Sequence, residues 1–457
     1  ILLVVLALFS FHRPGNDGVA IKGRLGTPST TVTLQAIHKQ DAPLNPQTAL
    51  APQPVTINLA PSLMTMSSPH RQPAEAVELD SGPVASLGGA SGESSPLIRL
   101  PGGGLSGRTA EGRAELGRRY GATPASERAV EEGLRWLAEH QLADGSWSFD
   151  LQLDPCGGRC RHSKKKDTTT PSTAATGLAL LAFLGAGHTH LDGPYAETVR
   201  RGIYFLRNDA MEVEAGYDLQ RGSMYGQGIA LMALSEALAM TADGKPRESD
   251  LYELVSRAAW FTVIAQHDSG SWGYVPGSPG DTTVTGWQVL SLVAAKRSDV
   301  PLATYTLRDA KRFLFSTSEE RDYSFGYNGP PGEPTTTAIG LTLMLYLGET
   351  PAYTPVYKAL TKLAERGPML TNVYHDYYGT LALHHSRHPD WDRWNTKLRD
   401  FLVAKQATSG HERGSWHFHD KFGDVGGRLY TTAMCTMMLE VYYRYLPLYA
   451  EIEKFPL

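Results

Sequence analysis

Two cysteines and a histidine share one basic loop of the sequence. Cys156 and Cys160 are four residues apart, and His162 follows two residues after Cys160. A structural zinc site needs four ligands of this kind, and only three are local, so a disulfide or two free thiols fit the spacing better than zinc. The remaining cysteine, Cys435, lies in an apolar stretch and is predicted to be a small core residue. We therefore expect no metal and no cofactor.

Acidic residues stand just before several apolar stretches, where they could either cap a helix or act as acids. Asp167, Asp281 and Glu333 are each followed by threonines, and His375 and Asp376 begin another such stretch. Asp or Thr at a helix start satisfies free backbone N–H groups and suits the helix dipole. Because the arrangement recurs at Asp167, Asp281 and Glu333, it favours capping at these three positions.

Aromatic side chains gather near the starts of the same apolar stretches. Their ring faces can stabilise a cation, although core packing explains many of them equally well. The candidate ligand-binding residues among them are Trp287, Tyr225, Tyr327, Tyr377 and Tyr430.

The elements that carry these residues repeat along the chain. A helical amphipathic stretch ends in Gln, and Gly-Ser-Trp follows, in residues 141–147, 266–272 and 406–416. Amphipathic runs recur near 129–141, 197–207, 253–266, 307–316, 356–365 and 394–406. Each precedes a nearly all-apolar run, near 173–186, 225–240, 284–295, 337–347, 377–385 and 430–443.

This alternation predicts an all-α fold, an α/α toroid of about six helix pairs in two concentric layers. A closed ring of helix pairs has no exposed end repeats, unlike an open solenoid. Four apolar runs share a glycine in the same register, at Gly177, Gly228, Gly286 and Gly340. Glycine inside a helix costs about 1 kcal/mol against alanine, so its recurrence suggests close contact between helices.

The repeated phrase resembles the "QW" motif of squalene–hopene and oxidosqualene cyclases. The resemblance covers about residues 126–446 and extends to protein prenyltransferase β subunits, which share the toroid. The motif side chains are expected to act as structural staples, with Gln bonding exposed carbonyls and Trp packing across a helix end. They are Gln141, Trp147, Gln266, Trp272, Gln406 and Trp416.

This resemblance implies a central cavity for an apolar, isoprenoid-like ligand. The cyclases protonate their substrate with an Asp-x-Asp-Asp cluster, and the nearest positional match here is the single Asp281, with Asp376 or His375 as its partner and Trp287 as a cavity wall. The prenyltransferases use an Asp, Cys and His zinc site, but Thr283 stands where that pattern places its cysteine. The resemblance therefore implies a terpenoid cyclase or prenyltransferase-like domain whose catalysis is open.

Composition divides the chain into three parts. Residues 1–12 are apolar and are expected to be the end of a membrane anchor or signal segment. Residues 13–122 are rich in Pro, Gly, Ser and Thr and are expected to form a disordered linker. Residues 123–457 form the toroid domain, which the anchor would hold outside the cytoplasm. The formal net charge of −4 gives no sign of nucleic-acid binding.

Two other classes of function remain open at this point. The domain could be a non-catalytic, membrane-tethered binding or scaffold protein, whose protein partners the sequence does not reveal. It could also act on carbohydrates, which would require a carboxylate pair about 5–10 Å apart.

Overall fold

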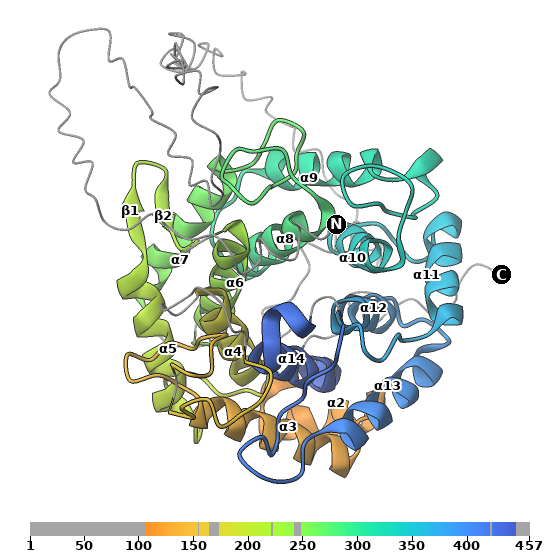
Figure 1. Cartoon of the computed structure of the whole chain (residues 1–457). Helices are drawn as coiled ribbons and strands as arrows, with labels where there is room; N and C mark the ends of the chain where they lie inside the picture. The colour runs from red at the N-terminus through yellow and green to blue at the C-terminus, as the bar shows by residue number, and fades with distance from the viewer. Residues whose placement is uncertain are drawn as a thin grey trace, which may run out of the picture. The chain divides into compact units, whose positions relative to one another are not determined.

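The computed structural model describes residues 107–153, 155–163, 173–220, 223–241, 248–420 and 423–444. Within them, six helix pairs form two concentric layers, so the expected all-α α/α toroid is confirmed (Figure 1). The predicted anchor and most of the predicted linker lie outside the described residues. Among the described helices, none combines the length and apolar character needed to cross a bilayer.

The inner layer consists of helices without a polar face. Every residue of α4 is buried, for example, because the helix packs against neighbours on all sides. Each inner helix contacts the next one, and the last contacts the first, which closes the ring. The inner helices are α4 (Thr173–Gly185), α6 (Met224–Thr241), α8 (Thr282–Arg297), α10 (Pro334–Tyr346), α12 (Val373–Ser386) and α14 (Gly423–Leu439).

The outer layer consists mainly of amphipathic helices that bury one face. In α3, for example, Val130, Leu134 and Leu137 follow one another at helical spacing and are fully buried. This helix begins with a capping box between Thr123 and Ser126. The outer helices are α3 (Pro124–Glu139), α5 (Ala196–Asp209), α7 (Ser249–Ile264), α9 (Thr304–Ser316), α11 (Thr354–Arg366) and α13 (Trp391–Lys405).

Several short elements fall outside the six pairs. Strands β1 (Met211–Val213) and β2 (Gly216–Asp218) form an antiparallel hairpin, and a 3₁₀ turn, η3, spans Glu319–Arg321. Helix α15 (Val441–Arg444) follows α14 and contacts α2 (Ala110–Tyr120). The predicted linker boundary at residue 122 is therefore wrong, because α2 already belongs to the folded domain. The sequence of α2 contains few apolar residues, and Gly117 is its one buried residue. The helix therefore gives little periodic signal in the sequence.

The three Gln–Gly–Trp motifs form the same set of hydrogen bonds. The glutamine Nε2 donates to the glycine carbonyl of its own motif, at 2.9 Å in each copy. It also donates to a carbonyl of another outer helix: that of Thr198 in α5, Thr306 in α9 or Ala129 in α3. The tryptophan Nε1 donates at 2.7 Å to a carbonyl near the end of the preceding outer helix. Each motif thus ties one repeat to its neighbour.

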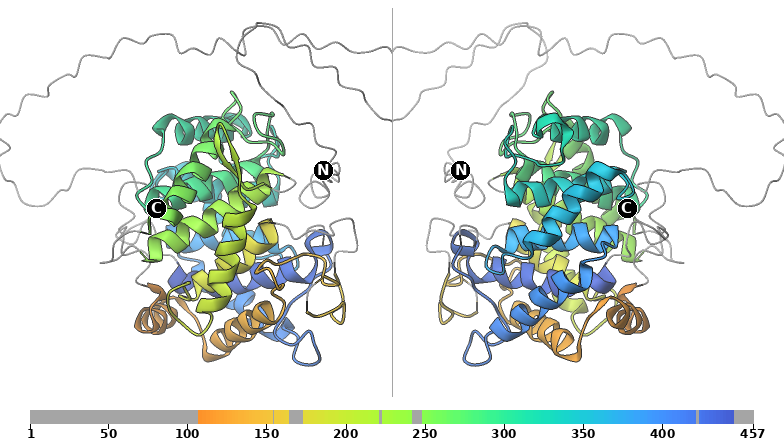
Figure 2. Two further views of the ribbon diagram at one scale, coloured as in Figure 1. Left: turned by 90° about the vertical axis from the view of Figure 1, so that its left-hand side faces the viewer. Right: turned by 90° about the vertical axis from the view of Figure 1, so that its right-hand side faces the viewer.

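The third motif connects the two ends of the folded domain. Gln406 reaches α3, the first outer helix, so this staple closes the outer ring. In both side views the first helices, in orange, lie beside the last, in blue (Figure 2), and α3 contacts both α13 and α14. The seam between first and last repeats is therefore built by residues far apart in the sequence.

The glycines of the inner layer allow close packing at several positions. A Cβ on Gly177 would lie 3.0 Å from the backbone nitrogen of Ala230 in α6, and one on Gly228 would lie 3.0 Å from the carbonyl carbon of Trp287 in α8. A Cβ on Gly286 would lie 3.1 Å from a side-chain atom, Cγ2 of Ile339 in α10, whereas Gly340 faces the ring of Phe325 in a loop. The expected close approach of helices therefore holds at the first three positions.

Candidate functional site

Asp281 lies at the N-terminal end of inner helix α8 and is only 3% exposed. Its Oδ1 accepts hydrogen bonds from the backbone N–H groups of Thr283 at 2.7 Å and Val284 at 3.0 Å, and from the Thr283 hydroxyl at 2.5 Å. The predicted capping interaction is therefore present. All three of these bonds end on Oδ1, and the Tyr327 hydroxyl also bonds the carboxyl.

The surroundings of Asp281 favour its protonated form. Burial raises the pKa of this carboxyl above its ordinary value, although hydrogen bonds from Thr283 and Tyr327 act in the opposite direction. No lysine or arginine of the described ranges forms an ion pair with it. A buried carboxyl without a basic partner is the kind of group that can serve as an acid near neutral pH.

Tyrosine hydroxyls surround Asp281 on two sides. Tyr225, in the first turn of α6, bonds the Thr283 hydroxyl at 2.5 Å; since that hydroxyl donates to Asp281, Tyr225 is the donor in this bond. On the other side, Tyr327 bonds Tyr274 at 2.8 Å. Tyr274 and Tyr327 are partly exposed loop residues, so they form the outer rim of the site above the buried carboxyl.

A cluster of aromatic rings from α8 and α12 continues inward from Asp281. The Trp287 indole Nε1 donates to the Tyr374 hydroxyl at 2.8 Å, which fixes the orientation of the indole. Tyr377 stacks on Trp287 with ring centroids 6.1 Å apart, and Tyr378 meets it edge-on at 6.2 Å. Tyr374 also interacts with Tyr430 of α14. The predicted ligand-binding residues therefore come from α6, α8, α12, α14 and one loop.

His375 and Asp376 have a different role from the one expected. The Asp376 carboxylate accepts the backbone N–H groups of Met369 and Leu370, both at 2.7 Å, and contacts His375 Nδ1 at 2.9 Å. The His375 ring lies 5.9 Å from that of Trp394 in outer helix α13. Within the described residues, neither side chain contacts Asp281. Asp376 holds the loop before α12, and the structure does not join this pair to the Asp281 site.

The other two acidic positions differ from Asp281. Glu333 occupies the N-cap position of α10 but makes no side-chain capping bond. Asp167 lies outside the described residues. Asp281 is therefore the one of the three for which a capping bond is seen.

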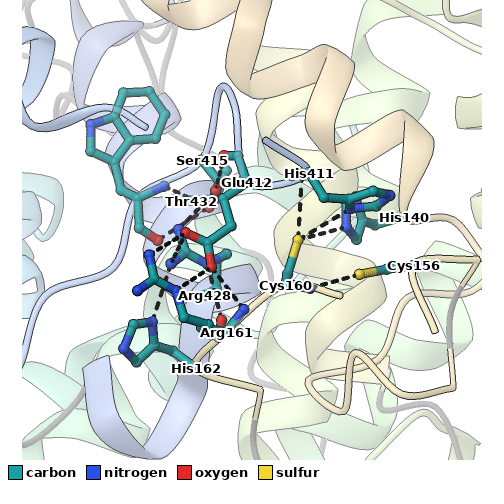
Figure 3. Close-up of polar contacts among 11 residues, drawn as sticks. His140, Cys156, Cys160, Arg161, His162, His411, Glu412, Ser415, Arg428 and Thr432 are labelled. Carbon is teal, nitrogen blue, oxygen red and sulfur yellow. Dashed lines mark hydrogen bonds and ion pairs between the residues drawn. The ribbon is translucent and has the colours of Figure 1, made fainter. Parts of the chain in front are cut away.

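A second group of chemically capable side chains lies at the seam of the ring (Figure 3). His140, Cys156, Cys160 and His411 place one ligand atom each within 4.8 Å of all the others. Neither Cys156 nor Cys160 forms a disulfide. Burial lowers the pKa of His140 to about 4, and burial together with Cys156 raises the pKa of the Cys160 thiol to about 12. A bound cation would reverse the second shift by stabilising the thiolate.

His162 belongs to a different group from the one its spacing suggested. Its ring stacks on that of His417 with centroids 3.9 Å apart, and His419 completes the group. The Arg428 guanidinium lies 3.1 Å from His162 Nδ1. Cys156, Cys160 and His162 therefore do not converge on one point, although they share a loop.

Several residues of these two sites escape sequence reasoning. His140 directly precedes the first motif glutamine, and His411 lies in the third motif, where Gln and Gly are eight residues apart rather than four. The longer spacing in the third motif is the sequence feature that could have pointed to His411. Asp420 follows the third motif without any distinguishing pattern. Burial is the largest cause that raises the pKa of Tyr430, and the Asp420 carboxyl raises it further.

Comparison with known proteins identifies the fold. No family model and no curated protein matches the chain. An α-1,6-mannanase of Salegentibacter sp. HEL1_6, solved with mannotetrose, aligns at a TM-score of 0.50 and 11% identity over 70% of this chain and 99% of its own.

Two further enzymes align at lower TM-scores. A type II terpene cyclase of Scytonema aligns at 0.46 and 10% identity over 71% of this chain and 98% of its own. An α-amylase of Clostridium perfringens aligns at 0.47 and 10% identity, over 70% and 98% of the respective chains. At these identities and TM-scores nothing about the function of this chain follows from the two enzymes.

Proposed function

We propose that the domain is a terpenoid cyclase-like enzyme that binds an apolar, isoprenoid-like ligand at the Asp281 end of the inner ring. The observation that carries this proposal is a buried carboxyl with a raised pKa and no basic partner within the described residues, surrounded by aromatic side chains. Such a carboxyl is suited to proton donation. The surrounding rings are suited to an apolar substrate that becomes cationic.

Each residue would have a distinct task in this reaction. Asp281 would transfer its carboxyl proton to a carbon of a substrate double bond, leaving a carboxylate and a carbocation. The N–H groups of Thr283 and Val284 would stabilise that carboxylate through Oδ1. Trp287, held by Tyr374, would present its ring to the cation. Loss of a proton from the cyclised cation would complete an isomerisation and restore the acid.

Native mass spectrometry of the purified chain, with lipid extraction of whatever is bound, tests the binding step. A co-purifying or added polyprene should bind to the wild type and be lost on Trp287→Ala. The matched control is Trp260→Ala, because Trp260 is 51% exposed on an outer helix. An equal loss of polyprene binding in Trp287→Ala and Trp260→Ala would contradict the proposed site. So would a wild type that binds no polyprene.

Turnover of the bound polyprene tests the chemical step. Asp281→Asn should keep binding and abolish cyclisation, because the amide keeps an acceptor for the cap but cannot supply the proton. Asp268→Asn, at an exposed aspartate in the second motif, is the control. Undiminished turnover by Asp281→Asn would exclude Asp281 as the acid. A chain that binds no polyprene would point to the scaffold function instead.

We also propose that the enzyme is attached to a membrane and lies outside the cytoplasm, as expected from the sequence. The proposed reaction does not depend on this location. An apolar substrate partitions into a bilayer, which is consistent with an enzyme attached to one. Membrane flotation of the chain with and without residues 1–12 would test that attachment.

A further inference from the structure

The second cluster consists of four potential zinc ligands that come from opposite ends of the folded domain. His140 follows α3, Cys156 and Cys160 lie in the loop toward α4, and His411 lies in the loop between α13 and α14. In Figure 3 dashed lines run from the Cys160 sulfur to both His140 and His411. His411 and Cys160 are separated by 251 residues. The fold therefore assembles this group, and no local sequence motif does.

The distances suit a tetrahedral metal. Zinc bonds of about 2.3 Å to sulfur and about 2.0–2.1 Å to nitrogen place tetrahedral S and N ligands about 3.5 Å apart. Cys160 Sγ lies 3.5 Å from His140 Nε2 and 3.3 Å from His411 Nδ1. With all four ligand atoms within 4.8 Å of one another, small side-chain movements are enough to complete the coordination shell.

A backbone carbonyl orients one imidazole for metal binding. His140 Nδ1 lies 2.7 Å from the Trp136 carbonyl. A carbonyl can only accept, so Nδ1 carries the hydrogen and the neutral ring directs the lone pair of Nε2 at Cys160. A hydrogen bond of this kind is the usual support for a histidine that binds a metal. The Trp136 ring stacks on His140 at 3.8 Å and fixes the plane of the imidazole.

Two N–H groups lie beside the sulfur atoms. The backbone N–H of Cys160 donates to Cys156 Sγ at 3.1 Å. The Trp136 Nε1–H is buried without a hydrogen-bond partner of normal geometry, although it lies near Cys160. Two thiolates and two neutral imidazoles would balance the charge of a Zn²⁺ ion.

Simple hydrogen bonding explains the cluster less well. A Cys160 thiol has one proton, yet it faces two imidazole nitrogens and the His411 carbonyl at 3.4 Å. A metal ion would satisfy both nitrogens at once. A disulfide would leave both histidines directed at a sulfur with no proton to share.

We propose that His140, Cys156, Cys160 and His411 bind one structural Zn²⁺ ion that joins the first helix pair to the sixth and closes the toroid. With four protein ligands the site has no open position, so it is structural rather than catalytic. This proposal replaces the sequence-based expectation of no metal. It does not depend on the function proposed for Asp281.

The seam around the cluster shows what the ion would reinforce. Glu412, next to His411, accepts the backbone N–H of Arg161 at 2.8 Å and pairs with Arg428 at 3.1 Å. Arg428 in turn donates its backbone N–H to the His162 carbonyl at 3.0 Å. It can do so because Gly427, at φ 67°, interrupts α14 just before it. The ion would therefore stabilise the start of α14.

The test is the zinc content of the full chain purified without added metal, measured by inductively coupled plasma mass spectrometry. We expect about one zinc per chain. Cys160→Ser and His411→Ala should each lower that content at least about tenfold, because three-ligand sites bind structural zinc poorly. The controls Cys435→Ser and His419→Ala should retain it, since Cys435 is in the core and His419 belongs to the neighbouring histidine group.

Cobalt substitution of the wild type covers the case in which a variant does not fold. Co²⁺ bound by the cluster should give sulfur-to-metal charge-transfer bands and the intense visible bands of tetrahedral coordination. A wild type without zinc that contains a Cys156–Cys160 disulfide by peptide mass spectrometry would overturn the proposal. So would a zinc content that falls with His419→Ala and not with Cys160→Ser.

Discussion

Two buried carboxyl groups at opposite ends of the inner ring show how differently one fold treats the same chemical group. Asp281, at the start of α8, and Glu236, in α6 near its end, are both 3% exposed. Asp281 is surrounded by hydroxyl and backbone N–H donors. Glu236 receives Arg108 at 2.9 Å and Arg444 at 3.0 Å. Burial is equal, so the partners decide which carboxyl is available for chemistry.

Buried ion pairs hold the Glu236 end of the ring together. Arg108 also donates to the carbonyl oxygens of Arg444 and Leu184, so it bonds the Arg444 backbone as well as the carboxylate that the two arginines share. A buried ion pair contributes little net stability, but breaking it is costly. The hydroxyl-lined Asp281 end has no such fixed counter-charge within the described residues. The contrast shows that two equally buried carboxyls differ in whether an arginine neutralises them.

The largest expected effect comes from neutralising each carboxyl in turn. Glu236→Gln would leave Arg108 and Arg444 buried without their counter-charge, and we expect a loss of about 3–5 kcal/mol in the free energy of unfolding. Asp281→Asn keeps the capping oxygen and should change it by less than about 1 kcal/mol. Urea unfolding of both variants measures the difference. Equal losses would remove the distinction between the two ends.

The pH dependence of stability should separate Asp281 from its amide. The pKa of Asp281 is higher in the folded than in the unfolded chain, where it is near 3.8. Its favourable contribution is therefore complete below that pH and is lost as the pH rises through the folded pKa. We expect the Tm of the wild type to fall relative to that of Asp281→Asn as the pH rises from about 4 through the folded pKa. Thermal melts of both proteins at a series of pH values measure this fall. A difference in Tm that stays constant across the series would refute a raised pKa of Asp281.

A smaller effect is expected from the rim of the site. Tyr327→Phe removes the hydrogen bond to Tyr274, for a loss of about 1 kcal/mol. It also removes a donor that lowers the pKa of Asp281, so the pH-dependent fall in Tm should move to higher pH. Tyr353→Phe, at a half-exposed tyrosine, is the control. A shift to lower pH would mean that Tyr327 does not bond Asp281.

The architecture could be predicted from the sequence because its signals are local. Gln266, Gly270 and Trp272 each act on backbone groups within their own repeat or the next. Apolar runs such as 284–295 could belong only to a buried helix. The Asp281 cap was likewise visible, since the residues that it bonds are its immediate neighbours.

The polar clusters could not be predicted in the same way, because ring closure creates them. His411 meets Cys160 across 251 residues, and Arg444 meets Glu236 across 208. Nothing in the spacing of such residues indicates contact. The pairing of Asp281 with His375 or Asp376 failed to appear for a related reason: a carboxylate beside a loop can satisfy backbone N–H groups instead, as Asp376 does.

The most direct test of the central claim is the protonation state of Asp281 itself. Infrared difference spectra between the wild type and Asp281→Asn, recorded across a pH series, isolate the carbonyl band of this one carboxyl. We predict a band from the protonated acid that persists above the ordinary aspartate pKa near 3.8. A band that disappears at or below that pH would show that Asp281 is an ordinary capping carboxylate and not an acid.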